Sequence, residues 1–258
     1  MCELLGISSA KKVDCNDLLN PFFSHASEHP DGWGLARFYG NSVSLEKEPV
    51  SALESVYLKN RLTDEIREDV LIAHIRKASV GNLSYQNSHP FARRDASGRL
   101  WTLAHNGTIF ESPVLEPYAQ LQNGSTDSER ILYYLVDRIN AGGNPGALSA
   151  EERFSIVEDV IRSITPKNMV NLLIYDGDLF YVHANRKDSL HMLKREDSVV
   201  ISTKALSQTG WEPVPLNIPL AFQCGRLVYT GRNHGNEYIK EETDTPQQKL
   251  STEDKARQ

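Results

Sequence analysis

Short runs of apolar or alternating residues, separated by polar turns, dominate the first part of the chain. Four runs are bounded by Gly, Asn, Asp or Ser, a pattern typical of strands. They are Glu3–Ser8, Gly34–Tyr39, Val70–Ile75 and Leu100–Ala104. Residues Leu53–Leu62 have helical spacing instead. The front of the chain is therefore predicted to be mainly sheet.

A helical pattern replaces the strand pattern in the middle of the chain. Over Ser128–Asn140 the apolar residues fall on one face of a helix. Thr126 and Glu129 form a Thr-x-x-Glu capping box that predicts where this helix begins, and two glycines at 142 and 143 predict its end. A second helix is predicted over Glu151–Ile164, before Pro166.

Strands return after the second helix. Val170–Tyr175 and Leu179–His183 flank Asp176-Gly177, a dipeptide that predicts a two-residue hairpin. Val199–Thr203 and Arg226–Tyr229 are predicted to be further short strands. This order favours an α+β fold with a core of two sheets covered by helices, and it excludes both a repeat array and a regular strand-helix alternation.

Composition places these elements in one large domain. The 258 residues are 40% hydrophobic, enough for a full core. Residues 2–230 are assigned to the domain, whereas residues 231–258 are polar, lack apolar periodicity and are predicted to be a mobile tail.

The net charge is -6 and no long basic run is present, so nucleic acid is not expected as a partner. Without a long apolar stretch or a leader-like start, the protein is expected to be cytoplasmic, with no membrane contact.

The three cysteines must be considered singly, because no Cys-x-x-Cys pair indicates a disulfide framework or a zinc site. Cys15 and Cys224 are interpreted as structural or surface residues. Cys2 follows the initiator methionine, and removal of Met1 would leave a thiol and a free α-amine on the same residue. That amine has an ordinary pKa of roughly 8, so it could accept the thiol proton. The alternative is that Cys2 is a chance second residue.

Three further segments carry candidate chemistry. Asn106-Gly107 follows the predicted strand Leu100–Ala104, where the Asn amide and a Gly main-chain N–H could point at one oxyanion. The alternative is a hairpin turn of the Asn-Gly kind. Arg76 closes a predicted strand and could hold a carboxylate, whereas Asp127 lies in the first turn of a helix and could meet an ammonium group. Together the last two would match an amino-acid head group, although each could be an ordinary structural residue.

Six motifs, in this order, resemble the class II glutamine amidotransferase domain, one of the N-terminal-nucleophile hydrolases: MCELLGISS, HPDGWGLARF, IAHIRKASVG, NSHPF, LAHNGTI and STDSE. The resemblance covers roughly residues 2–135, and Ile201–Leu206 before Trp211 is similar to the closing strands of stand-alone members. It is greatest to the small proteins that include γ-glutamyl hydrolases of glutathione breakdown and ergothioneine synthesis. The resemblance implies a four-layer αββα sandwich of two mainly antiparallel sheets covered by helices.

The resemblance also implies roles for individual residues. Cys2 would be the nucleophile and its own α-amine the base. Asn106 and the Gly107 N–H would form the oxyanion hole, while Arg76 would bind the substrate α-carboxylate and Asp127 its α-ammonium.

Three positions after Arg76 complete the comparison. Ser79 falls where several members have a hydroxyl near the glutamine. Val80 replaces a histidine and Lys77 an aromatic residue of some amidotransferases, so closure over the substrate and delivery of ammonia are expected to differ.

Histidines are frequent in the motif segments and could suggest a metal site. For His74, His89, His105 and the loop pair His25 and His29, structural hydrogen bonding is the preferred interpretation. The predicted mechanism needs neither a metal nor another cofactor.

The predicted reaction is hydrolysis of the γ-amide of glutamine or a γ-glutamyl compound through a γ-glutamyl thioester. One alternative is a glutaminase subunit that passes ammonia to a separate synthase. Another is a non-enzymatic binding or regulatory protein on the same fold, which retention of Met1 would favour. The physiological substrate and the oligomeric state do not follow from the sequence.

Overall fold

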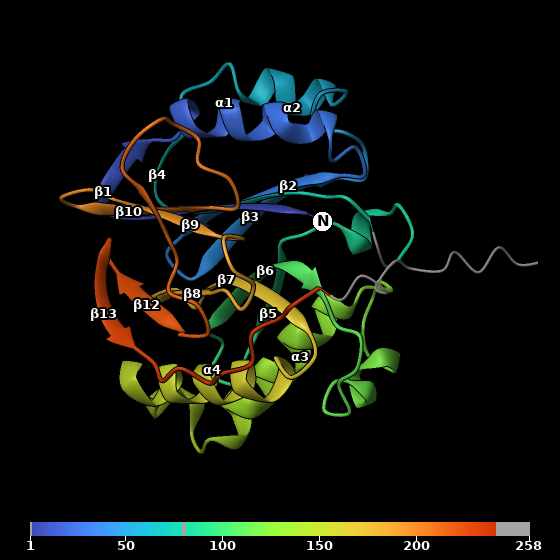
Figure 1. Cartoon of the computed structure of the whole chain (residues 1–258), viewed down its shortest axis with the longest axis vertical. Helices are drawn as coiled ribbons and strands as arrows, with labels where there is room; N and C mark the ends of the chain where they lie inside the picture. The colour runs from blue at the N-terminus through green and yellow to red at the C-terminus, as the bar shows by residue number, and fades with distance from the viewer. Residues whose placement is uncertain (1, 79–80, 241–258) are drawn as a thin grey trace, which may run out of the picture.

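Two antiparallel sheets are stacked face to face between helices in the computed structural model, which describes residues 2–78 and 81–240 (Figure 1). The seven-stranded sheet has the order β11 (Trp211–Pro213), β9 (His191–Lys194), β10 (Ser198–Ser202), β1 (Glu3–Asp14), β4 (Arg67–Ile75), β2 (Trp33–Tyr39), β3 (Ser42–Glu48). The six-stranded sheet has the order β13 (Arg226–Thr230), β12 (Leu220–Gln223), β8 (Phe180–His183), β7 (Met169–Tyr175), β6 (Leu100–Thr108), β5 (Phe91–Arg94).

Helices cover the outer face of each sheet. Figure 1 shows α1 (Asn16–Ser24) and α2 (Val56–Arg61) above the larger sheet, and α3 (Asp127–Ala141) and α4 (Ala150–Ile164) below the smaller one. Short 3₁₀ turns, η1 to η4, occur at His25–Ser27, Tyr85–Asn87, Glu116–Gln120 and Pro145–Ala147. The structure thus confirms the predicted four-layer αββα sandwich.

Alternation along the strands explains why the layers stack. On β1, Leu4 packs between the two sheets against Phe180, whereas Leu5 points the other way, toward Phe22 of α1. Successive strand residues face opposite sides, and here both sides are covered, so the start of β1 is apolar on both faces. A third apolar layer joins the smaller sheet to α3 and α4. The first residues of β1 are therefore fixed from above and below.

The predicted strands and helices are present, with differences that have physical causes. The helix α1 was missed because Pro21 lies inside it, and prolines usually interrupt helices. The edge strand β3 was missed because its sequence, SVSLEKE, is largely polar and only partly buried. The strand β6 continues past Ala104 to Thr108, so Asn106 and Gly107 lie within it.

The first part of the predicted tail runs along the domain. Main-chain N–H groups of Gly231, His234 and Tyr238 donate to the carbonyls of Pro219, Asn217 and Asn185. Such bonds need no apolar periodicity, so the sequence pattern does not indicate them. Residues 231–240 are thus hydrogen-bonded to the domain. The rest of the predicted tail, 241–258, lies outside the described residues.

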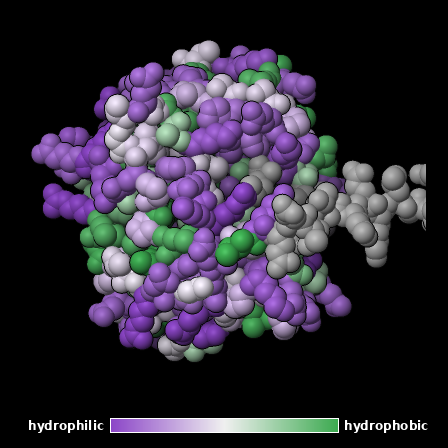
Figure 2. All heavy atoms as spheres, viewed as in Figure 1, coloured by the Kyte–Doolittle hydropathy of each residue, from purple (hydrophilic) through white to green (hydrophobic). Residues whose placement is uncertain are grey.

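The face drawn in Figure 2 is mostly hydrophilic, with apolar side chains in small separate groups. Within the described part of the chain, no helix is long and apolar enough to cross a membrane.

Candidate active site

Cys2 lies immediately before the central strand β1, between the ends of two neighbouring strands. The register of β1 places Glu3 opposite Ile75 of β4 and Leu5 opposite Ser202 of β10. The Cys2 thiol is partly buried, and Sγ lies 3.6 Å from the carbonyl oxygen of Lys77. Burial raises the pKa of this thiol, while the positive charge of Arg76 opposes the rise. A nearby base is therefore needed to form the thiolate at neutral pH.

Arg76 follows β4 and is held at both its main chain and its guanidinium. Its N–H donates to the carbonyl of Gly32 at 2.8 Å, and its carbonyl accepts from the N–H of Asp31 at 3.0 Å. The guanidinium donates to the carbonyls of Asn82 at 3.1 Å and Gly81 at 3.2 Å. Arg76 is 2% exposed. This side chain thus supports residues 81 and 82 and also faces the pocket that contains Cys2.

Asn106 and Gly107 are paired in β6 opposite Asn171 and Val170 of β7. The hairpin-turn alternative for this dipeptide is therefore wrong. A Cβ on Gly107 would lie 1.9 Å from the carbonyl oxygen of Met169, so only glycine fits there. Asn106 is 1% exposed, and its Oδ1 has no hydrogen-bond partner among the described residues.

Asp127 begins α3 and accepts two hydrogen bonds. Its Oδ2 accepts from the N–H of Ile109 at 2.7 Å, and its Oδ1 from the Ser128 hydroxyl at 3.2 Å. Half of the predicted capping box forms, because Thr126 Oγ1 accepts from the Glu129 N–H. The other half does not form, because the Glu129 carboxylate accepts instead from the N–H groups at 123 and 124.

Two cavities meet at Cys2. One is narrow, about 20 Å³, and is lined by Cys2, Arg76, Gly107 and Asp127. The enclosed part of this cavity holds about one water molecule. The other, about 360 Å³, is lined by Cys2 and Asn106. The structure thus brings four of the other five predicted site residues around the Cys2 thiol; the fifth, Ser79, lies outside the described residues.

The larger cavity contains charged residues that, apart from Lys77, were not among the residues discussed from the sequence. Its lining includes Glu3, Glu28, Lys77, Arg186, Lys187, Asp188 and Lys204. Lys204 Nζ lies 2.8 Å from Glu3 Oε1 and 3.2 Å from Glu28 Oε2. The pairing of β10 with β1 brings Lys204 there, because Thr203 and Leu4 exchange hydrogen bonds. The sequence of Ile201–Leu206 indicates only a resemblance to the closing strands of the family. The contact of Lys204 with Glu3 follows from the register of the strands, which the sequence does not show.

The histidines divide into two groups. His105 bonds to Ser128 Oγ at 2.9 Å and to the Met169 carbonyl at 3.1 Å, and the loop pair is likewise bonded, which confirms a hydrogen-bonding role for these three. The prediction is wrong for His89, whose ring nitrogens have no hydrogen-bond partner among the described residues, and His74 is buried beside it. Their rings stack at 4.2 Å, and burial lowers the pKa of His74 to about 3. Both rings are therefore neutral at physiological pH.

Known proteins are similar to this chain in sequence and in fold. The family model for class II glutamine amidotransferases matches residues 1–198. A putative glutamine amidotransferase from Escherichia coli is 30% identical over 208 residues, which cover 79% of this chain and 80% of the relative. The chain belongs to the class II glutamine amidotransferases.

Solved structures share the fold. A predicted glutamine amidotransferase from Pseudomonas aeruginosa matches with a TM-score of 0.64 and 24% identity, over 88% of this chain and 100% of its own. The glutamine phosphoribosylpyrophosphate amidotransferase from Bacillus subtilis has a TM-score of 0.65 and 17% identity. That match covers 90% of this chain but 49% of the Bacillus enzyme.

Proposed function

We propose that the protein hydrolyses the γ-amide bond of glutamine or of a γ-glutamyl compound and releases glutamate. The observation that carries this proposal is the position of Cys2 between two cavities of different character. One contains Arg76 and Asp127, which suit the carboxylate and ammonium of an amino acid. The other contains Asn106 and can receive the leaving group.

The first half of the reaction forms a thioester. After removal of Met1, the α-amine of Cys2 takes the proton from Sγ, and the thiolate attacks the γ-carbonyl carbon. The negative oxygen accepts hydrogen bonds from the Asn106 amide and the Gly107 N–H; one such donor contributes about 10²–10³ in rate. The protonated α-amine of Cys2 then gives its proton to the leaving nitrogen, the C–N bond breaks, and a γ-glutamyl thioester remains on Cys2.

The second half of the reaction restores the enzyme. The α-amine takes a proton from water as the water oxygen attacks the thioester carbon. The C–S bond breaks, glutamate leaves, and the proton returns to Sγ. Because burial raises the pKa of the thiol, a base attached to the same residue compensates for an environment that disfavours the thiolate.

The size and charge of the larger cavity favour a leaving group bigger than ammonia. A cavity of about 360 Å³ lies in the range that accommodates small organic molecules. Lys77 and Lys187 line it with exposed side chains, and Asp188 adds a carboxylate. A γ-glutamyl compound whose amine part carries charged groups would therefore be bound better than glutamine.

A glutaminase subunit that donates ammonia to a separate synthase is the second candidate. It is supported by the Bacillus subtilis enzyme, of which about half lies outside the match with this chain. Co-purification with a partner that raises glutaminase activity would favour this candidate over a stand-alone hydrolase.

The test is to incubate Met1-trimmed protein with glutamine and a panel of γ-glutamyl peptides and amines, and to measure glutamate. We expect Cys2→Ala to abolish glutamate release while the circular dichroism spectrum is unchanged. Cys224→Ser, at an exposed thiol, is the control and should retain activity. Full activity of Cys2→Ala would refute the mechanism, and trimmed protein that acts on no γ-glutamyl substrate would refute the function.

A further inference from the structure

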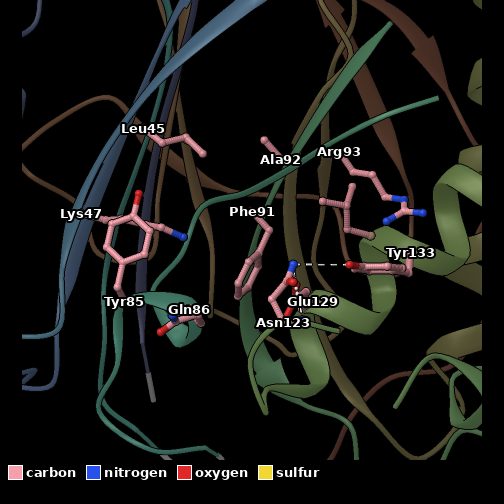
Figure 3. Close-up of a pocket in the computed structure, with 11 residues that line it drawn as sticks. Leu45, Lys47, Tyr85, Gln86, Phe91, Ala92, Arg93, Asn123, Glu129 and Tyr133 are labelled. Carbon is pink, nitrogen blue, oxygen red and sulfur yellow. Dashed lines mark hydrogen bonds between the residues drawn. The ribbon is translucent and has the colours of Figure 1, made fainter. Parts of the chain in front are cut away.

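A separate cavity of about 610 Å³ lies between the free edges of the two sheets (Figure 3). It is bounded by the edge strands β3 and β5, by the turn η2 and by the start of α3. It shares no lining residue with either cavity that contains Cys2. Its volume is typical of pockets that bind small molecules, and the proposed hydrolysis makes no use of it.

Aromatic rings and cations alternate around this cavity. Lys47 Nζ lies 4.7 Å from the ring centroid of Tyr85 and 5.2 Å from that of Phe91. The Arg93 guanidinium carbon lies 3.9 Å from the ring centroid of Tyr133, and Figure 3 shows these two side chains on the α3 side of Phe91. The rings hold the cations in place, and N–H groups of the cations can donate hydrogen bonds to a ligand.

Neither cation is neutralised by an acid. Among the described residues, no carboxylate lies within ion-pairing distance of Lys47 or Arg93. Lys47 donates to the carbonyls of Ser88 at 2.7 Å and Pro90 at 3.4 Å, and burial lowers its pKa to about 8. The Arg93 Nε is buried without a hydrogen-bond partner. Glu129 lines the cavity and its charge acts on Lys47, but it forms no ion pair with either cation.

The carboxylate of Glu129 is already bound by main-chain groups. Glu129 accepts hydrogen bonds from the main-chain N–H groups of Asn123 at 3.0 Å and Gly124 at 2.8 Å. These bonds direct its carboxylate to the turn before α3. An anionic ligand would instead pair with Lys47 and Arg93, since burying an unpaired charge is unfavourable.

We propose that this cavity is a second ligand site, which binds a planar aromatic or heteroaromatic molecule bearing a carboxylate or phosphate. The anionic group pairs with the cations Lys47 and Arg93. The ring packs against the side chains of Tyr85, Phe91 and Tyr133. A neutral ring would contact only the aromatic side chains, and an anion without a ring would contact only the two cations.

Two chain segments connect this cavity to the narrow one beside Cys2. The segment around η2 and β5 contributes Gln86 and Phe91 to the ligand site but His89 to the Cys2 pocket. The start of α3 contributes Glu129 to the first and Asp127 to the second. A ligand that restrains both segments is expected to lower the KM for glutamine, because Asp127 is then held in place before the substrate arrives.

Calorimetry with the Cys2→Ala variant tests binding independently of catalysis. The probes are adenosine monophosphate, which carries a phosphate, and benzoate, which carries a carboxylate. Adenosine and inorganic phosphate are the controls, because each is one half of adenosine monophosphate. We expect at least one of the first two to bind saturably, and each half to bind at least about tenfold more weakly, a difference of about 1.4 kcal/mol. Failure of both anions to bind in the millimolar range would overturn the proposal, as would equal binding of inorganic phosphate alone.

Substitutions locate the site. Lys47→Gln and Arg93→Gln should each weaken binding of the better probe by about tenfold or more, whereas Lys59→Gln, on the exposed side of α2, should leave it unchanged. If Lys47→Gln does not fold, Arg93→Gln alone decides. Binding that is the same in all variants would overturn the assignment. In the active protein, an unchanged KM for glutamine at saturating probe would overturn the link to the Cys2 pocket.

Discussion

The carboxylate of Asp127 accepts a hydrogen bond from the main-chain N–H of Ile109 at 2.7 Å. Ile109 is two residues beyond Gly107, so the start of α3 is tied to the strand end that presents the proposed oxyanion donor. A change at Asp127 can therefore alter both the proposed ammonium site and the position of Gly107. Tests of Asp127 should preserve this hydrogen bond and remove only the charge.

The substitution Asp127→Asn meets this condition, since the amide oxygen can still accept from Ile109. We expect kcat/KM for glutamine to fall by about thirtyfold or more, because a buried group that pairs with a charge contributes 2 kcal/mol or more. The fall should lie mainly in KM. Steady-state assays of glutamate release would measure it.

A substrate analogue provides the control for Asp127. Glutaramate has the γ-amide but no α-ammonium group, so wild-type protein should discriminate strongly against it, and Asp127→Asn should lose most of that discrimination. Equal discrimination in both proteins would contradict contact between Asp127 and the ammonium.

Arg76 needs a conservative substitution, because its guanidinium also supports the carbonyls of Gly81 and Asn82. Arg76→Lys keeps the charge but not the two-pronged geometry, so we expect KM for glutamine to rise by about tenfold or more while the fold is retained. γ-Aminobutyramide, which lacks the α-carboxylate, should be affected less. An equal effect on both substrates would indicate that Arg76 only supports the loop.

Gly107→Ala should damage both stability and activity. The added Cβ would overlap the Met169 carbonyl oxygen, so β6 and β7 must separate locally, at a cost of about 1–3 kcal/mol in unfolding free energy. Displacement of the N–H should lower kcat by about a hundredfold. Gly146→Ala is the control, because its Cβ would meet Ser97 Cβ at 3.4 Å and Asn144 Oδ1 at 3.6 Å, both ordinary contacts. Similar activity in the two variants would contradict the oxyanion role of Gly107.

Acid should destabilise the fold through its buried histidines. Burial, followed by the charge of Arg76, lowers the pKa of His74 from 6.5 to about 3. Between these values the unfolded chain binds a proton that the folded chain does not, so stability decreases as pH falls, by about 1.4 kcal/mol per pH unit for the ring. Urea unfolding at pH 7 and pH 5 measures this.

The variant His74→Gln should show a weaker dependence on pH over this range, since it removes the titrating ring. His191→Gln, at a partly exposed histidine, is the control for the loss of a histidine elsewhere. The same slope in His74→Gln as in wild type would contradict the assignment.

The hydrophobic pattern was sufficient for the layers of the fold because the buried strands and helices have clear periods. The start of β1, Val70–Ile75 and the face of α3 were all predicted close to their observed positions. Edge strands such as β3 were missed, since an edge exposed to solvent keeps little apolar alternation.

The sequence motifs predicted the residues proposed to bind and cleave the substrate, but not the charged residues that surround them. Arg76, Asn106, Gly107 and Asp127 lie in local motifs, and the structure brings them to Cys2. Lys204 and the residues around Arg186 come from strand register and loop packing, which a single sequence does not reveal. The cations Lys47 and Arg93, which form no ion pair among the described residues, likewise come together only because two sheet edges meet in space.

The extended conformation of Asn106-Gly107 also protects the pair chemically. In a mobile chain, the glycine nitrogen readily attacks the preceding asparagine amide, and the resulting succinimide opens to a carboxylate. The pairing of β6 with β7 holds both residues in one conformation and restricts that attack. Once unfolded, the chain loses this protection, and deamidation would place a negative charge where the proposed oxyanion forms. Heat inactivation should therefore become irreversible with time, even in samples that refold.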